Sequence, residues 1–104
     1  MEKLDALMRL EKIAEAVSWL TDDFVVTDVW LDYYKHKGPA VHIDRYQYDC
    51  KDETALEEYG KVCNYPTERI ENYTKHYDGV VVHDPNGVVL FQLVNLHHGG
   101  EQDG

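Results

Sequence analysis

Basic residues are scarce in this chain. Ten Lys and Arg stand against twenty Asp and Glu, which gives a formal net charge of −10. Proteins bind nucleic-acid backbones mainly through Lys and Arg contacts to phosphates, so this balance argues against direct nucleic-acid binding. An anionic membrane surface is disfavoured for the same reason. Cationic protein surfaces, divalent metals and small neutral ligands remain as partners.

Long apolar segments and cysteines are also few. The longest apolar run, Val88–Phe91, is far shorter than the roughly 20 residues of a membrane-spanning helix. The charged start Met1-Glu-Lys-Leu-Asp is unlike a secretory signal. Cys50 and Cys63 flank a predicted helix, which places them about 15–20 Å apart if it is continuous. This distance excludes a disulfide. We therefore expect free thiols in a cytoplasmic protein that does not bind membranes.

Motifs for catalysis, cofactors and metals are sparse as well. Ser18 is the sole serine and has no Gly-x-Ser-x-Gly elbow around it. No Gly-rich loop precedes a predicted helix, which disfavours phosphate and dinucleotide binding. The six histidines show no His-x₃-His spacing, and the two cysteines are far apart in the sequence. The sequence therefore predicts a non-catalytic protein with no cofactor and no metal site.

Hydrophobic periodicity predicts one α+β domain over residues 1–96, followed by a flexible tail over 97–104. The expected elements are a helix over 3–20, a hairpin over 22–48, a helix over 52–63 and a hairpin over 80–94. The first hairpin turns at Lys35–Pro39 and the second at Asp84-Pro85-Asn86-Gly87, which has the composition of a type I turn with a glycine bulge.

The segment 67–78 is the least certain part of this pattern. Ile70, Tyr73 and Tyr77 are three and four residues apart, which favours a helix, while an extended conformation stays open. With this helix, the predicted fold is a four-stranded antiparallel sheet made of two hairpins. Helices cover mainly one face, in the order α-β-β-α-(α)-β-β.

The first helix has more apolar residues than one face needs. Its main stripe consists of Leu7, Leu10, Ile13, Ala14, Val17 and Leu20. Leu4, Met8 and Trp19 fall outside this stripe. Together with Leu90 and Val94 they predict, as one alternative, a contact between two copies of the chain.

The first hairpin has the most informative pattern. If Tyr33 faces Val41 across the turn, Asp32 lies opposite His42, and Trp30 lies opposite Asp44. One face of the hairpin then collects carboxylates and large aromatic side chains. These residues are Asp28, Trp30, Asp32, Tyr34, His42, Asp44, Tyr46 and Tyr48.

We expect this face to dock on a basic protein surface. Asp28 and Asp32 would lie about 13 Å apart along the strand, roughly two phosphate steps, with Asp44 between them. The sharpest form of the hypothesis is a nucleic-acid-mimicking inhibitor of a nucleic-acid-handling protein, like small accessory proteins of phages and mobile elements. A second hypothesis is a small enzyme or ligand-binding domain with a pocket at His42, Asp32 and Cys63. A structural homodimer is the third.

Overall fold

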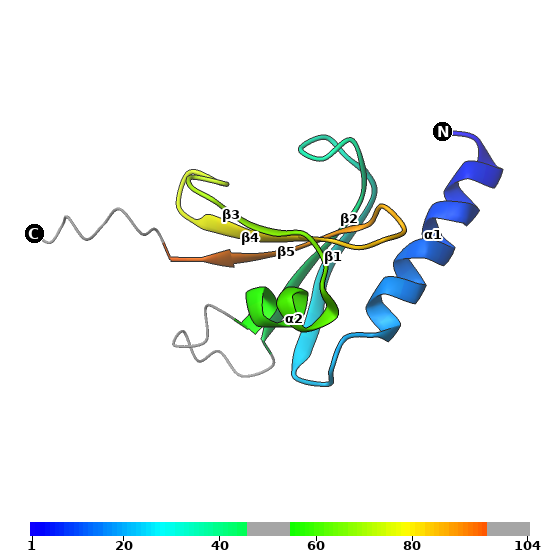
Figure 1. Cartoon of the computed structure of the whole chain (residues 1–104). Coiled ribbons are helices and arrows are strands. Elements are labelled where there is room, and N and C mark those ends of the chain that lie inside the picture. Colours follow the sequence, from blue (N-terminus) through cyan, green and yellow to red (C-terminus); the bar gives the residue numbers. More distant parts are fainter. Residues whose placement is uncertain (46–54, 96–104) are drawn as a thin grey trace, which may run out of the picture.

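The computed structural model describes residues 1–45 and 55–95 (Figure 1). These ranges contain two helices and five strands. In chain order they are α1 (Lys3–Ser18), β1 (Phe24–Tyr33), β2 (Gly38–Arg45), α2 (Ala55–Cys63), β3 (Thr67–Ile70), β4 (Asp78–His83) and β5 (Val89–Val94). The predicted α+β class is confirmed. Neither described helix has the length and apolar character needed to cross a membrane.

The strands form one mixed sheet in the order β1-β2-β5-β4-β3. Neighbouring strands are antiparallel except β2 and β5, which run parallel. The prediction of four antiparallel strands is therefore wrong in both number and direction. The parallel pair arises because the chain passes through α2, β3 and β4 before β5 joins β2, whereas a direct hairpin connection would give an antiparallel pair.

Both helices pack on one face of the sheet, as predicted. Ile13 and Ala16 of α1 and Leu56 of α2 belong to one buried cluster. The sheet contributes Val41, Ile43, Val80, Val82, Val88, Leu90 and Val94 to this cluster. The burial of Leu90 and Val94 means that the predicted homodimer contact through these two residues is wrong.

The position of β5 explains why its sequence is apolar on both faces of the strand. Val89 and Phe91 belong to a second buried cluster on the opposite face of the sheet. The helices cover one face of this central strand and aromatic side chains cover the other, so both of its faces are buried. Its turn from β4 also agrees with the prediction. The N–H of Gly87 donates to the carbonyl of Asp84 at 3.0 Å, and Gly87 has a φ of 87°.

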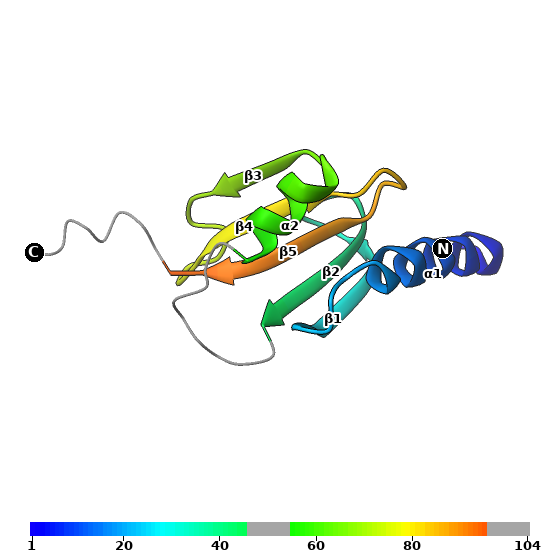
Figure 2. The ribbon, with the colours of Figure 1, turned by 60° about the horizontal axis from the view of Figure 1, so that its bottom comes forward.

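Only the C-terminal half of α1 is packed on the sheet. Val17 and Leu20 border the cluster that contains Ile13 and Ala16, whereas Leu7 and Leu10 remain exposed. In Figure 2, the N-terminal half of the helix extends past the end of the sheet. The predicted apolar stripe therefore overestimates the length of helix that the sheet can cover.

Helix α2 is terminated by polar groups at both ends. Near its start, the N–H of Leu56 donates to the side-chain oxygen of the buried Gln92 at 3.4 Å. At its end, Asn64 adopts a φ of 61°, and the N–H of Tyr65 donates to the carbonyl of Gly60 at 2.8 Å. This is a Schellman-type C-cap. The predicted helix start at Asp52 lies outside the described residues.

The predicted helix over 67–78 is wrong. Thr67–Ile70 forms β3, and the chain then turns back into β4. The buried carboxylate of Asp78 accepts the N–H of Asn72 at 2.9 Å and pairs with Arg69 at 3.4 Å. Asn72 has a φ of 54°, which a right-handed helix does not allow. Thus a buried acid holds a turn where the apolar spacing alone favoured a helix.

The predicted register of the first hairpin is also wrong. Asp28 lies opposite His42, and Trp30 lies opposite Ala40, because Tyr33 pairs with Gly38 and the turn is shorter than expected. Pairing is irregular between Val26 and Asp28 and again between Trp30 and Tyr33.

Pro39 consequently lies inside β2 instead of in the turn. Proline lacks an N–H for strand pairing. It is tolerated there because the pairing of β1 with β2 is irregular near Pro39, and pairing with β5 begins only at Ala40.

Gly79 provides a test of how closely the Tyr73 ring packs against β4. A Cβ at position 79 would lie 2.6 Å from Cγ of Tyr73, so the ring must move if a side chain is added. We expect Gly79→Ala to lower the free energy of unfolding by about 1–3 kcal/mol, measured by urea denaturation. Gly38→Ala is the matched control, since the nearest atom to its added Cβ is 4.0 Å away. Equal stability of the two variants would contradict the assigned packing.

Candidate partner-binding site

The face of the sheet opposite the helices is filled by aromatic rings around Phe91. We call it the aromatic face. Phe91 is 2% exposed. Its ring centroid lies 5.0–6.5 Å from those of five other rings. They are the rings of Trp30, Tyr33, His36, His42 and Tyr73. Two of the residues expected at a partner surface, Trp30 and His42, therefore take part in internal packing.

Two loops meet over the aromatic face. His36, in the β1–β2 turn, forms a 2.7 Å hydrogen bond between its Nε2 and the hydroxyl of Tyr73, which lies between β3 and β4. The ammonium of Lys35 donates to the carbonyl of Tyr73 at 2.8 Å. Figure 1 shows the two loops on the side of the sheet away from α2. These bonds connect the β1–β2 turn to the β3–β4 loop, which come from opposite edges of the sheet, and they hold Tyr73 over Phe91.

His42 is part of the same packing. Its ring stacks on Phe91 with an interplanar angle of 3°, and its Nδ1 lies 3.8 Å from Oδ2 of Asp28. Its Nε2 is buried and has no hydrogen-bond partner among the described residues. The predicted partner of His42 was Asp32, but the register brings Asp28 to this position instead.

The remaining predicted site residues are dispersed. Asp32 pairs with Arg9 of α1 at 3.5 Å and is separated from Asp28 by the irregular part of the strand. Tyr34 is exposed in the turn, and Asp44 lies opposite Val25. The structure thus brings together Asp28, Trp30 and His42, whereas Tyr46 and Tyr48 lie outside the described residues.

The three residues of the predicted pocket do not come together. His42 lies on the aromatic face, and Asp32 contacts Arg9 of the first helix. Cys63 ends α2, which packs against the opposite face of the sheet, and its thiol forms no disulfide. Residues 1–45 and 55–95 contain no group of three or more His, Cys, Asp or Glu side chains placed to hold a metal ion.

Strand β1 exposes a surface that the sequence pattern did not single out. Val26 and Val29 lie on the helix side of the sheet, yet they are 42% and 44% exposed. On the other side, Val25 is also exposed, and the carboxylate of Asp28 is 59% exposed. With Asp22, which precedes the strand, these residues form what we call the β1 edge surface. It offers apolar and acidic groups side by side.

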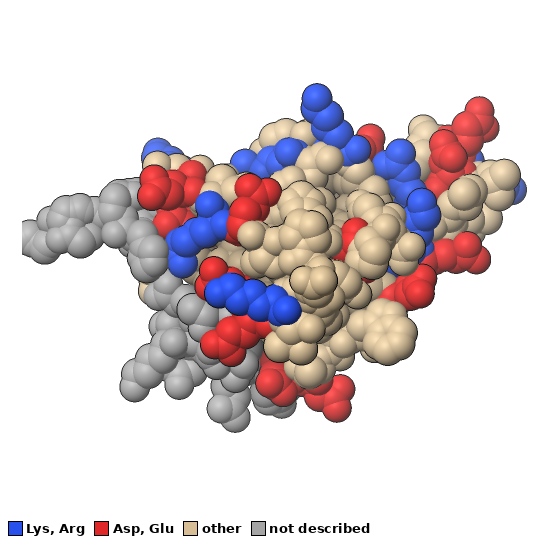
Figure 3. All heavy atoms as spheres, viewed as in Figure 1, with Lys and Arg blue, Asp and Glu red and all other residues tan. Residues whose placement is uncertain are grey.

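The chain segment that forms this surface carries charged residues of one sign. Residues 13–34 cover the end of α1 and all of β1, and they contain no Lys or Arg. Their acidic residues are Glu15, Asp22, Asp23, Asp28 and Asp32. In Figure 3, acidic atoms gather at the lower rim, where β1 begins, and they border uncharged surface. Such a field favours the approach of a cationic partner.

A sequence signal for this surface did exist. Phe24, Val25 and Val26 are consecutive apolar residues, so both faces of the strand are apolar at its start. For a central strand this is ordinary, but β1 is an edge strand with less cover. The position of the strand in the sheet, which the sequence alone did not give, makes the pattern informative.

Comparison of the chain with protein-family models, curated protein sequences and solved structures gives no match.

The burial of His36 predicts a pH dependence of stability. Burial lowers the pKa of His36 below its ordinary value of 6.5, and the charges of His83 and Lys35 act in the same direction against Glu68. The unfolded chain therefore binds a proton that the folded chain excludes. Stability should fall as pH decreases from about 7 through the folded pKa.

We expect His36→Gln to flatten this dependence between pH 5 and 7, measured by urea denaturation at each pH. His76→Gln is the control, because His76 is an exposed histidine between the same two strands as Tyr73. An unchanged slope in the His36 variant would show that other groups cause the pH dependence.

Proposed function

We propose that this chain is a small acidic binding protein, without catalytic activity of its own, that docks on a basic surface of another protein. The observation that supports this most directly is the β1 edge surface. It combines exposed valines with a stretch of chain that contains acidic residues and no basic ones. Apolar and acidic groups together are suited to a partner that offers Lys or Arg around an apolar contact.

The two kinds of side chain would contribute differently to binding. Burial of the valines supplies a favourable term of about 25 cal/mol per Å² of apolar surface removed from water. The carboxylates mainly increase the rate of association and select partners of opposite charge. Because Asp22 and Asp28 are near the surface, their contribution is screened by salt.

The choice of a basic protein over a second copy follows from charge. Two copies, each with a net charge of −10, repel each other, and contact through β1 would bring their acidic residues together.

A nucleic-acid-handling protein is one source of a suitable basic surface. The expected row of Asp28, Asp32 and Asp44 does not form, because Asp32 is turned towards Arg9. Our proposal therefore defines the partner by its positive charge. Competition by DNA or RNA for the same partner would identify its nucleic-acid groove as the docking site.

The proposal predicts that two carboxylates at β1 control binding. The protein is immobilised, a retained protein is identified from a bacterial lysate, and its purified form is titrated with each variant. Asp22→Asn combined with Asp28→Asn should weaken binding about tenfold at low salt, which corresponds to two surface pairs of about 0.7 kcal/mol each. The difference should diminish as salt increases.

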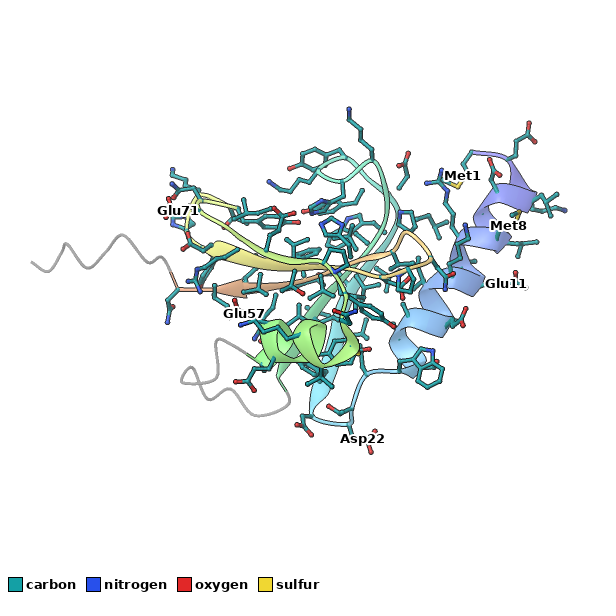
Figure 4. The ribbon with its side chains drawn as sticks, in the orientation of Figure 1. Met1, Met8, Glu11, Asp22, Glu57 and Glu71 are labelled. Atoms are coloured by element: carbon teal, nitrogen blue, oxygen red, sulfur yellow. The ribbon has the colours of Figure 1, made fainter. Side chains whose placement is uncertain are left out.

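Glu57→Gln combined with Glu71→Gln is the matched control. It changes the net charge by the same amount, and Figure 4 shows both residues far from Asp22. This control should bind like the unchanged protein. Equal loss of binding in both double variants would show that overall charge, and not the β1 edge surface, controls binding. Salt-independent binding would contradict the proposal.

A further inference from the structure

We propose that the outer edge of β1 binds an extended, Lys- or Arg-containing segment of the partner as a sixth strand of the sheet. This inference rests on the proposed function and specifies how the basic partner is held. A strand added to a sheet edge gains affinity from backbone hydrogen bonds and specificity from alternate side chains. Both features can be examined in β1.

The two edges of the sheet differ in what they offer. β3, at one edge, has four residues, whereas β1, at the other, has ten and is the longest described strand. Protected edge strands are typically short, contain Lys or Pro, or carry β-bulges. β1 contains no Lys or Pro and pairs with β2 alone among the described strands, although that pairing is irregular between Val26 and Asp28. Near one end, Arg9 donates to the carbonyl of Leu31 at 2.9 Å, which leaves residues 24–30 as the available length.

The exposed side chains define what the added strand would contact. Val26 and Val29 are exposed on the helix side, and Val25 and Asp28 on the side of the aromatic face. Side chains on adjacent strands lie about 4.5–5.5 Å apart when they are directly opposite. A segment with apolar residues on one face and basic residues on the other would therefore cover the valines and place a cation beside Asp28.

Charge again selects the occupant. An antiparallel pairing of β1 with β1 of a second copy would bring Asp28 of both chains to one seam. Arg9 pairs with Asp32, but residues 13–34 hold no Lys or Arg to offset Asp28. An alternating basic and apolar segment offers charge of the opposite sign, and it brings backbone groups to the same edge. The occupant is therefore a segment of a basic partner.

The test uses a defined peptide and the full chain. The probe is an acetylated and amidated peptide, Lys-Val-Lys-Val-Lys-Val-Lys, and the comparison is the same peptide with N-methyl groups on its internal amides. The second peptide keeps the charge and side chains but lacks the donors that a strand needs. Amide hydrogen exchange of the ¹⁵N-labelled protein is measured with each peptide. The ordinary peptide should slow exchange within residues 24–30 at least tenfold, and the methylated peptide should not.

Several results would overturn the inference. Equal effects of both peptides, protection outside β1, or no effect of either peptide would each exclude strand addition. Protection of β1 that increases with protein concentration alone would identify a second copy as the occupant. In all these cases, salt-dependent capture of a basic partner that is lost in the Asp22 and Asp28 variant would leave the proposed function standing. Loss of that capture would instead refute the proposed function itself.

A pair of variants locates the site independently. Val29→Lys places a positive charge beside the proposed strand and should abolish peptide protection. Val62→Lys is the control, because Val62 is 86% exposed on α2, on another part of the surface. It should leave protection unchanged. The two peptides on the unchanged protein provide the answer even if Val29→Lys affects folding.

Discussion

The sheet depends on a short parallel contact between β2 and β5. Three residue pairs join them: Ala40 with Val89, Val41 with Leu90, and His42 with Phe91. On one side of this seam are β1 and β2, and on the other are the antiparallel strands β3, β4 and β5. Both buried clusters cross the seam, since Val41 and Leu90 lie in one and Ala40 and Phe91 in the other. The two parts of the protein are therefore held together mainly by side-chain packing.

This packing decides which surface is available for a partner. Phe91 gathers rings from β1, β2 and two loops, and in doing so it covers much of the aromatic face. The carboxylates expected on that face divide, because Asp28 remains beside His42 while Asp32 turns to α1. What stays exposed is the edge of the sheet farthest from β3. The packing of the sheet leaves the valines and acidic residues of this edge exposed, and the proposed binding mode uses them.

Local signals in the sequence predicted local structure well. The apolar spacing of α1, the turn at Asp84–Gly87 and the two-sided apolar pattern of β5 each correspond to an observed element. The errors concern interactions between distant residues. The buried carboxylate of Asp78 accepts a hydrogen bond from the turn at Asn72 and stabilises it. The spacing of apolar residues in the sequence does not predict this interaction. The short turn and the irregular pairing between Trp30 and Tyr33 likewise change the hairpin register, so that Asp28 lies opposite His42 while Asp32 pairs with Arg9. A shift by one residue exchanges the two faces of a strand.

The position of β5 has a consequence for synthesis of the protein. It is the last of the described strands along the chain, yet β2 and β4 both pair with it. Ribosomes add about 5–20 residues per second, so Val41 waits on the order of seconds before its neighbour Leu90 exists. During that time β2 and β4 have no strand between them, and the valines of the future core lack their cover. If the ribosome stalls before Val89, β2 and β4 each lack the strand that pairs with them on one side. Such a chain exposes apolar surface that chaperones can bind.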